Sequence, residues 1–272
     1  MMTVLEITDV ILKSKKYSNV DRSVVERITA EAVPKYTGQK EIIKAIKKEL
    51  HIIHESFLLA GSHAKTDVIL ENYSGDDIIK DKKAALELMA LHTSTKERLG
   101  QETEIYKLIS RHIKAEDSII DIGCGYNPFA LPFYTKLPKN YIAYDIDSLT
   151  IQTLNTYFGL AGLPYRAEVC DAAVQTPKEQ ADTLLLLKLF PILERQKKGR
   201  AFEIIKELDC SISIVSFPLK STSGKEKGME VFYSEQFENG LPPSFFINEK
   251  TKFFNEIFYI LKKHPPILSV HK

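Results

Sequence analysis

Four strand-length apolar runs, separated by stretches with helical periodicity, are the feature that most constrains the fold of this chain. Each run is rich in branched or aromatic residues, and the runs begin near Ser118, Tyr141, Ala181 and Cys210. In one intervening stretch, residues 102–113, the apolar residues recur at helical spacing. Strands that alternate with helices predict a parallel sheet covered by helices, and therefore an α/β fold.

The first ninety residues show helical spacing alone. Val24, Val25 and Ile28 recur at that spacing behind Asp21, which can cap the start of the helix. A further helix is predicted from about residue 40 to residue 59, whereas the turn residues between positions 61 and 75 predict a connection that contains one helical turn.

No strand-like alternation appears before residue 115. The sequence therefore predicts two parts, a helical N-terminal module over residues 1–90 and an α/β domain over residues 91–272.

Composition narrows the class of protein. With 44% apolar residues in 272, the chain can bury a sizeable core, and its net charge of +1 neither demands nor excludes a nucleic acid. The three cysteines form no Cys-x-x-Cys pair, which argues against zinc and against a disulfide framework. There is no signal-peptide pattern and no apolar run near the ~20 residues that span a bilayer. We expect a cytoplasmic protein with no metal and no membrane partner.

A glycine turn follows the first predicted strand, in the segment from Asp121 to Pro128. Gly123 and Gly125 allow a tight turn and a close approach to a ligand, but the third glycine of a dinucleotide fingerprint is absent. Asp145 ends the second strand, where a carboxylate can accept hydrogen bonds from both ribose hydroxyls. A ligand with a ribose and no phosphate, S-adenosylmethionine, fits this pattern. The alternative is a glycine turn in a doubly wound protein without a cofactor.

Ligands of parallel sheets lie beyond the carboxyl ends of the strands. Asp171 closes a predicted third strand, where it either reaches the amino group of adenine or is an ordinary turn residue. The segment from Lys188 to Glu194 follows the fourth strand and would face the methyl group.

Five segments of the chain resemble one family, the 16S rRNA (guanine(1405)-N(7))-methyltransferases of the Arm/Rmt type and of actinomycete self-resistance. The most specific are a His-x-Ser-Thr-x-Glu-Arg segment and a Ser-Gly-Lys-Glu-Lys-Gly-Met segment, and the five span residues 92–98, 121–132, 144–147, 187–196 and 216–229. The resemblance implies a Rossmann-like class I S-adenosylmethionine methyltransferase, with an N-terminal module that binds ribosomal RNA. The S-adenosyl-L-homocysteine left after transfer is the implied product.

The resemblance also implies a set of cofactor contacts. Arg98 would reach the carboxylate of the cofactor, which suits a guanidinium, and Phe57 would cap the site from the N-terminal module. The other implied contacts are His92, Thr93, Ser94, Gly123, Asp145, Asp171, Ala172, Leu187 and Gln196. The alternatives are a solvated helix charge for Arg98 and a capping or core histidine for His92. Lys96 stands where many family members carry arginine, and Gly100 is a second departure from the pattern.

Guanine N7 carries a lone pair and no proton, so methyl transfer to it requires no general base. Catalysis then rests on alignment and electrostatics. With support from the resemblance, Lys188 and Glu194 are the candidates that position the base, unless they form a salt-bridged loop rim. Phe190 is a candidate for stacking on the base or for the core.

The target base must leave its stack, because side chains cannot easily enter the deep major groove of A-form RNA. A basic surface is therefore expected, with candidates Lys44, Lys47, Lys48, Arg195, Lys220, Lys225 and Lys227. The alternative is a set of solvated helix faces. The implied partner is 16S rRNA in the assembled small (30S) ribosomal subunit, bound by a monomer.

Three other functions stay open at this point: an adenine(1408)-N1 methyltransferase of 16S rRNA, a small-molecule methyltransferase, and a catalytically silent RNA-binding protein on the same scaffold. The helical module argues against the second. If the resemblance holds, the new positive charge on the methylated guanine would repel polycationic aminoglycosides and confer resistance.

Overall fold

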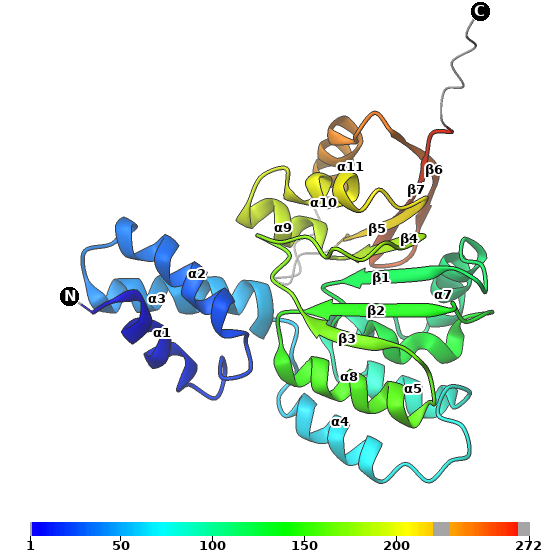
Figure 1. The fold of residues 1–272 in the computed structure, drawn as a ribbon, viewed down its shortest axis with the longest axis horizontal. Coiled ribbons are helices and arrows are strands. Elements are labelled where there is room, and N and C mark those ends of the chain that lie inside the picture. The colour runs from blue at the N-terminus through cyan, green and yellow to red at the C-terminus, as the bar shows by residue number, and fades with distance from the viewer. Residues whose placement is uncertain (1, 220–228, 266–272) are drawn as a thin grey trace, which may run out of the picture.

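A seven-stranded sheet forms the centre of the protein, whose computed structural model describes residues 2–219 and 229–265. The strand order is β3-β2-β1-β4-β5-β7-β6 (Figure 1). Five strands are parallel: β1 (Ser118–Ile122), β2 (Asn140–Asp145), β3 (Arg166–Val169), β4 (Thr183–Leu187) and β5 (Ile212–Pro218). The predicted α/β fold is confirmed.

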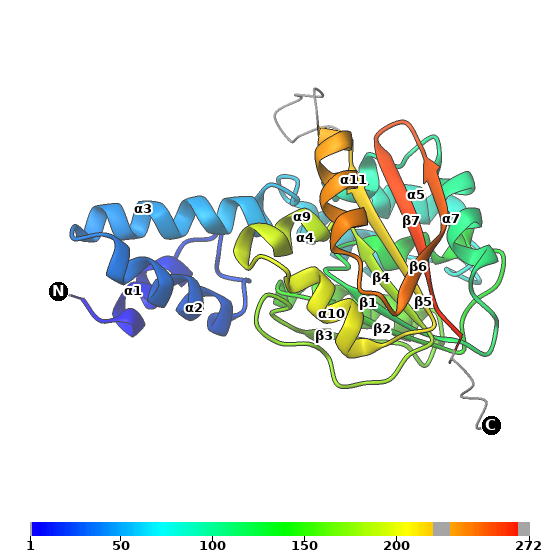
Figure 2. The same ribbon diagram turned by 90° about the horizontal axis from the view of Figure 1, so that it is seen from above.

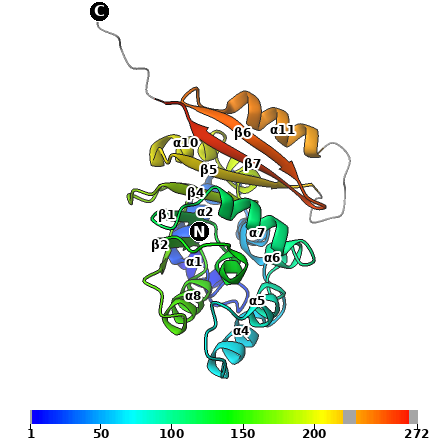
Figure 3. The same cartoon turned by 90° about the vertical axis from the view of Figure 1, so that its right-hand side faces the viewer.

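The predicted parallel sheet is confirmed for β1 to β5, and two further strands that the sequence did not predict form an antiparallel edge. There β7 (Glu256–Lys263) pairs antiparallel with β5, and β6 (Phe245–Lys252) pairs antiparallel with β7. Figure 3 shows this hairpin along the sheet edge under α11 (Met229–Gly240). The hairpin turn between Lys252 and Glu256 contains no Gly or Pro, the residues that most strongly predict a turn.

Helices cover both faces of the sheet, and successive residues of β1 point into two separate cores. Ile119 packs into one core with α5 (Lys82–Met89), α7 (Glu102–Arg111), the 3₁₀ segment η3 (Asn127–Phe133) and α8 (Ser148–Leu160). Ile120 packs into the other with α9 (Phe190–Gln196), α10 (Arg200–Leu208) and α11. This alternation is the period-two pattern of a strand buried on both sides.

Three helices form a body of their own beside the sheet (Figure 2). These are α1 (Val4–Leu12), α2 (Arg22–Ala32) with the short η1 (Val33–Lys35), and α3 (Gln39–Leu50), which continues as one π-helical turn, η2 (His51–Glu55). The predicted N-cap is confirmed, because the Asp21 carboxylate accepts from the Ser23 amide at 2.9 Å. The apolar sides of these helices meet in a separate core.

The predicted connection between residues 61 and 75 was wrong, because α4 (Ser62–Glu71) occupies most of it. Its apolar residues follow no clear helical stripe, so spacing did not reveal it. Its Thr66 hydroxyl lies 2.9 Å from the carbonyl of Ser62 and 3.2 Å from the hydroxyl of Tyr126 in η3.

Both α4 and α5 contribute to the core of the α/β body, whereas the separate core of the first helices ends at Ile53. We therefore use "helical module" for Val4–Glu55. The short α6 (Thr93–Lys96) follows α5. In the part of the chain that the structure describes, no helix has the length and apolar character to cross a membrane.

Candidate active site

The chain turns sharply after β1 at the two glycines of the motif. Gly123 and Gly125 both adopt positive φ, +64° and +47°. A Cβ on Gly123 would lie 2.6 Å from a methyl carbon of Leu189, and one on Gly125 would lie 2.7 Å from the ring of His92. Both positions therefore require glycine for backbone conformation and for space.

Asp145 faces this turn from the end of β2. Its carboxylate accepts from the Gly125 amide at 2.9 Å and from the Asp147 amide at 3.1 Å. Burial raises the pKa of Asp145, while the bond from the Gly125 amide acts in the opposite direction. A carboxylate has about four acceptor positions, so this one retains capacity for the two hydroxyls of a ribose.

A cavity opens beyond the carboxyl ends of β1, β2, β3 and β4, around the point where the strand order reverses. Its space is about 810 Å³ with its open mouth and the solvent there included, and it lies at the switch point where ligands of such sheets bind. Nine expected cofactor contacts line it: Phe57, His92, Ser94, Gly123, Asp145, Asp171, Ala172, Leu187 and Gln196. A bare glycine turn, a ribose-side carboxylate and apolar walls fit S-adenosylmethionine.

The helical module supplies part of the cavity wall. Ile53 and His54 come from its last turn, and the ring of Phe57 directly after it stacks on His92 with 6.1 Å between centroids. Thr93, an expected contact, does not line the cavity. Its amide donates to the Phe57 carbonyl at 2.9 Å, so it holds that segment in place.

Arg98 does not line the cavity either. Its guanidinium is buried and donates two bonds to the Glu256 carboxylate, at 2.8 and 2.9 Å. It also donates to the side chains of Tyr106 and Asn127. Arg98 therefore ties the segment after α6 to the start of β7, and its expected contact with a cofactor carboxylate stays a prediction.

Lys188 lines the cavity directly after β4, in the left-handed conformation with φ of 60°. Its amide donates to the Ser216 carbonyl at 3.1 Å. Its ammonium group donates to the Glu97 carboxylate at 2.6 Å and to the Ser94 carbonyl at 3.2 Å, and lies 3.6 Å from Glu256. A strained backbone held by several partners is typical of functional positions.

Two other catalytic candidates lie outside the cavity. Phe190 has no exposed surface and packs edge to face against Phe202, Phe217 and Phe237, which favours its core alternative, while the stacking role stays a prediction. The Glu194 carboxylate accepts from the amides of Gly199 and Ala201 at 2.7 and 3.1 Å. It caps the start of α10, which agrees with the structural alternative, and the base-positioning role stays a prediction. The order of the motifs along the chain did not distinguish side chains that pack in the core or cap a helix from side chains that face the cavity.

The structure also brings to the site residues that the sequence interpretation missed. His54 and Asp147 form a buried pair at 2.6 Å, and His63 lies 3.4 Å from the same carboxylate. Burial acts to raise the pKa of Asp147, but its two histidine partners outweigh burial and hold the pKa well below its usual range. Arg27 of α2 pairs with Asp171, and Glu256 lies beside Lys188. Asp147 belongs to a motif segment, whereas the others carried no local signal.

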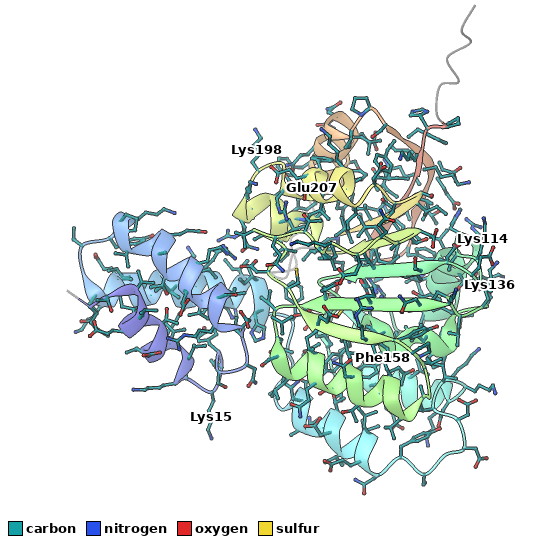
Figure 4. All side chains as sticks on the ribbon, in the orientation of Figure 1. Lys15, Lys114, Lys136, Phe158, Lys198 and Glu207 are labelled. Carbon is teal, nitrogen blue, oxygen red and sulfur yellow. The ribbon has the colours of Figure 1, made fainter. Side chains whose placement is uncertain are left out.

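The proposed RNA-binding residues divide into three groups. Lys44, Lys47 and Lys48 are exposed on α3. Arg195 is half-exposed and pairs with Glu49 at 2.6 Å. The remaining three, Lys220, Lys225 and Lys227, lie outside the described residues. Figure 4 shows Lys15 and Lys198 pointing outward from the helical module and from the α9–α10 connection. Among the described residues, no cluster of three or more His, Cys, Asp or Glu could hold a metal ion.

This strand order, with a glycine turn after the first strand and an acidic residue ending the second, defines a Rossmann-like methyltransferase fold and site. The sequence profile of the ribosomal RNA methyltransferase (FmrO) family matches residues 13–260. The chain belongs to this family.

Individual relatives agree with the profile. A 16S rRNA (guanine(1405)-N(7))-methyltransferase of Proteus mirabilis is 30% identical, covering 95% of this chain and 96% of the relative. One of Micromonospora echinospora is 31% identical with the same coverage. The crystal structure of the 16S rRNA methyltransferase RmtF in complex with S-adenosyl-L-homocysteine matches with a TM-score of 0.88 and 29% identity, over 97% of this chain and 100% of that one.

A substitution at Phe190 tests its core role. We expect Phe190→Ala to lower the free energy of unfolding by about 3–5 kcal/mol, because it leaves a large cavity among aromatic rings. Phe190→Leu keeps most of the volume and should retain both stability and methylation. Urea denaturation and a methylation assay measure the two effects. Loss of methylation by a stably folded Phe190→Leu protein would restore the stacking role.

His92 should stay neutral at physiological pH. Its burial, with the nearby charges of His54 and Lys188, lowers its pKa from 6.5 to about 3. The unfolded chain takes up this proton below pH 6.5 and the folded protein does not, so the buried ring lowers stability progressively as the pH falls. NMR should show a ring signal, assigned with His92→Gln, that is constant between about pH 5 and 8. A midpoint near 6.5 would contradict the neutral, buried ring.

Proposed function

We propose that this protein transfers a methyl group from S-adenosylmethionine to N7 of guanine 1405 in 16S rRNA. The observation that carries the proposal is the cavity at the switch point of the sheet, where the Gly123–Gly125 turn faces the Asp145 carboxylate. The protein that contains this cavity is also similar, over 95% of its length, to enzymes with this activity.

In this proposal, different residues around the cavity bind different parts of the cofactor. Asp145 accepts from the ribose hydroxyls, and the turn at Gly123 leaves room for the rest of the nucleoside. Asp171 accepts from the amino group of adenine, and Leu187 provides an apolar wall. Bound S-adenosylmethionine supplies an electrophilic methyl carbon on a positively charged sulfur.

The chain's own residues then align the base. The N7 lone pair of guanine forms the new bond to the methyl carbon while the carbon–sulfur bond breaks and its electron pair goes to sulfur. No proton moves, so the site requires no general base. Lys188 lies at the end of β4 with its ammonium group anchored by Glu97 and Ser94, where it can orient the guanine edge. Its charge is balanced by carboxylates, which limits its repulsion of the cationic product.

We further propose that the substrate is the assembled small ribosomal subunit, bound by a monomer in the cytoplasm through the basic helical module. The methylated guanine carries a positive charge that repels polycationic aminoglycosides, so methylation would confer resistance. An adenine(1408)-N1 specificity and a catalytically silent RNA-binding role are the alternatives that the first experiment separates.

Mapping the methyl group tests the activity. Assembled small ribosomal subunits incubated with enzyme and labelled S-adenosylmethionine should carry the label at guanine 1405 of their 16S rRNA, located by primer extension or mass spectrometry. Asp145→Ala should abolish both the label and the calorimetric heat of S-adenosyl-L-homocysteine binding, because the ribose loses its acceptor.

The matched control is Glu168→Ala, which removes an exposed carboxylate of β3 and should change neither readout. A label on another nucleotide would contradict the assignment to guanine 1405. The absence of both the label and the heat of binding would contradict the proposed methyltransferase activity.

A second experiment tests the RNA surface. Reversing the charges of Lys44, Lys47 and Lys48 should weaken binding to the small subunit and reduce the salt dependence of binding by about one unit per phosphate-contacting lysine. Cofactor affinity should stay unchanged.

Reversal of Lys114, Lys136 and Lys139 is the control, since these exposed lysines lie at the far end of the sheet, where Figure 4 labels the first two. Equal losses in the two triple variants across a salt series would argue against a binding role for α3.

A further inference from the structure

One side chain of the helical module reaches across to the α/β body beside the cavity. Arg27, in the middle of α2, places its Nε 2.7 Å and one Nη 3.3 Å from the two oxygens of the Asp171 carboxylate. The same Nη donates to the side-chain oxygen of Gln196 at 2.8 Å. The other Nη donates to Glu31 on its own helix at 3.1 Å. The side chain of Arg27 is only 15% exposed.

Both partners of Arg27 line the cavity. Asp171 follows β3 and is 8% exposed, and one of its oxygens also accepts from the Ala173 amide at 3.1 Å. Gln196 ends α9. A guanidinium that bonds both oxygens of a carboxylate fixes the plane of that carboxylate. Arg27 also fixes the amide of Gln196, because the amide oxygen accepts from Arg27. The amide NH₂ donates one hydrogen to the Ile192 carbonyl at 3.4 Å, which leaves its second hydrogen to donate elsewhere.

Both residues line the cavity, with acceptor capacity left on Asp171 and one N–H left on Gln196. The Asp171 carboxylate accepts from an amino group, and the Gln196 amide donates to a ring nitrogen. Adenine has an amino donor beside a ring acceptor, whereas hypoxanthine has a carbonyl acceptor beside a ring N–H donor. The pair therefore suits adenine, provided that each side chain keeps the orientation that Arg27 gives it.

We propose that Arg27 is a positioning residue for cofactor recognition, and that the helical module sets adenine selectivity by orienting Asp171 and Gln196. This inference rests on the proposed function, because it takes S-adenosylmethionine as the ligand of the cavity. It assigns the module a second task beside RNA binding. Because coupling between two binding events is reciprocal, docking of the module and binding of the cofactor strengthen each other.

A second contact between the helical module and the α/β body also joins a basic side chain of the module to an aspartate at a strand end. His54 at the end of the module pairs at 2.6 Å with Asp147, which follows β2 as Asp171 follows β3. The Asp21 amide donates to the Ile146 carbonyl at 2.9 Å, next to Asp147. The module is thus attached to the body at two strand ends that both border the cavity.

Calorimetry with two ligands tests the inference. The parent protein should prefer S-adenosyl-L-homocysteine over S-inosyl-L-homocysteine, its deaminated form. Arg27→Ala should weaken binding of the adenosyl ligand by about tenfold or more and reduce the preference, because Asp171 and Gln196 lose their common anchor. Arg27→Lys retains the charge without the two-pronged bond and should recover part of the affinity. At saturating cofactor, methylation by Arg27→Ala should be restored, so the effect lies in KM.

Two further variants separate positioning from stability. Arg22→Ala removes an exposed arginine of the same helix that pairs with Asp9 and Glu26, and it should change neither affinity. In an Asp171→Asn background, Arg27→Ala should cost less than in the parent, because the anchored carboxylate is already gone.

Equal losses for both ligands, unchanged affinities, or the absence of any preference in the parent would overturn the inference. Binding of S-adenosyl-L-homocysteine by the parent together with a label on guanine 1405 would leave the proposed function intact in each of these cases.

Discussion

Three acidic side chains line one cavity and a fourth lies behind its Lys188, and each needs a partner because an unpaired buried carboxylate is costly. They are Asp145, Asp147, Asp171 and Glu256. The first three follow parallel strands. Glu256 begins β7, which runs antiparallel to β5, so its first residue reaches the same edge of the sheet. The topology therefore concentrates negative charge at the edge where ligands bind.

The partners of these carboxylates come from distant parts of the chain, and this determines how the protein is assembled. A backbone amide of the glycine turn donates to Asp145. The helical module supplies His54 as the partner of Asp147 and Arg27 as the partner of Asp171. Arg98 binds Glu256 and holds the segment after α6 against β7. Removing one member of such a pair leaves an uncompensated buried charge, which costs more than the pair itself contributes. The helical module is thus part of the cofactor site and not an appendage.

The sequence predicted the parts of the site that are local. Gly123, Gly125 and Asp145 were found because a turn and two strand ends leave a short, spaced pattern. Arg27 and Glu256 were missed because their partners lie far away along the chain, and no period in the sequence joins them.

Phe190 and Glu194 illustrate a different limit. Both lie in a motif segment of the family, and a motif records which residues recur without recording which way they point. One packs among aromatic rings and the other caps a helix, so proximity to the cavity along the chain did not give contact with it. The β6–β7 hairpin was missed since its turn carries neither Gly nor Pro.

Charge balance at the end of β4 connects this assembly to the chemistry. Transfer of a methyl group to N7 places a positive charge on guanine, and a free lysine at the cavity wall would oppose that charge. Lys188 is not free in this sense: Glu97 bonds its ammonium group, and Glu256 lies 3.6 Å away. With Arg98 on the other side of Glu256, two cations face two carboxylates, and the cluster is neutral. In the proposed mechanism, Lys188 would then use its hydrogen-bonding capacity without the electrostatic cost of its charge. The network that fastens β7 to the segment after α6 is what makes this possible, so the stability of the fold and the chemistry of the site depend on the same contacts.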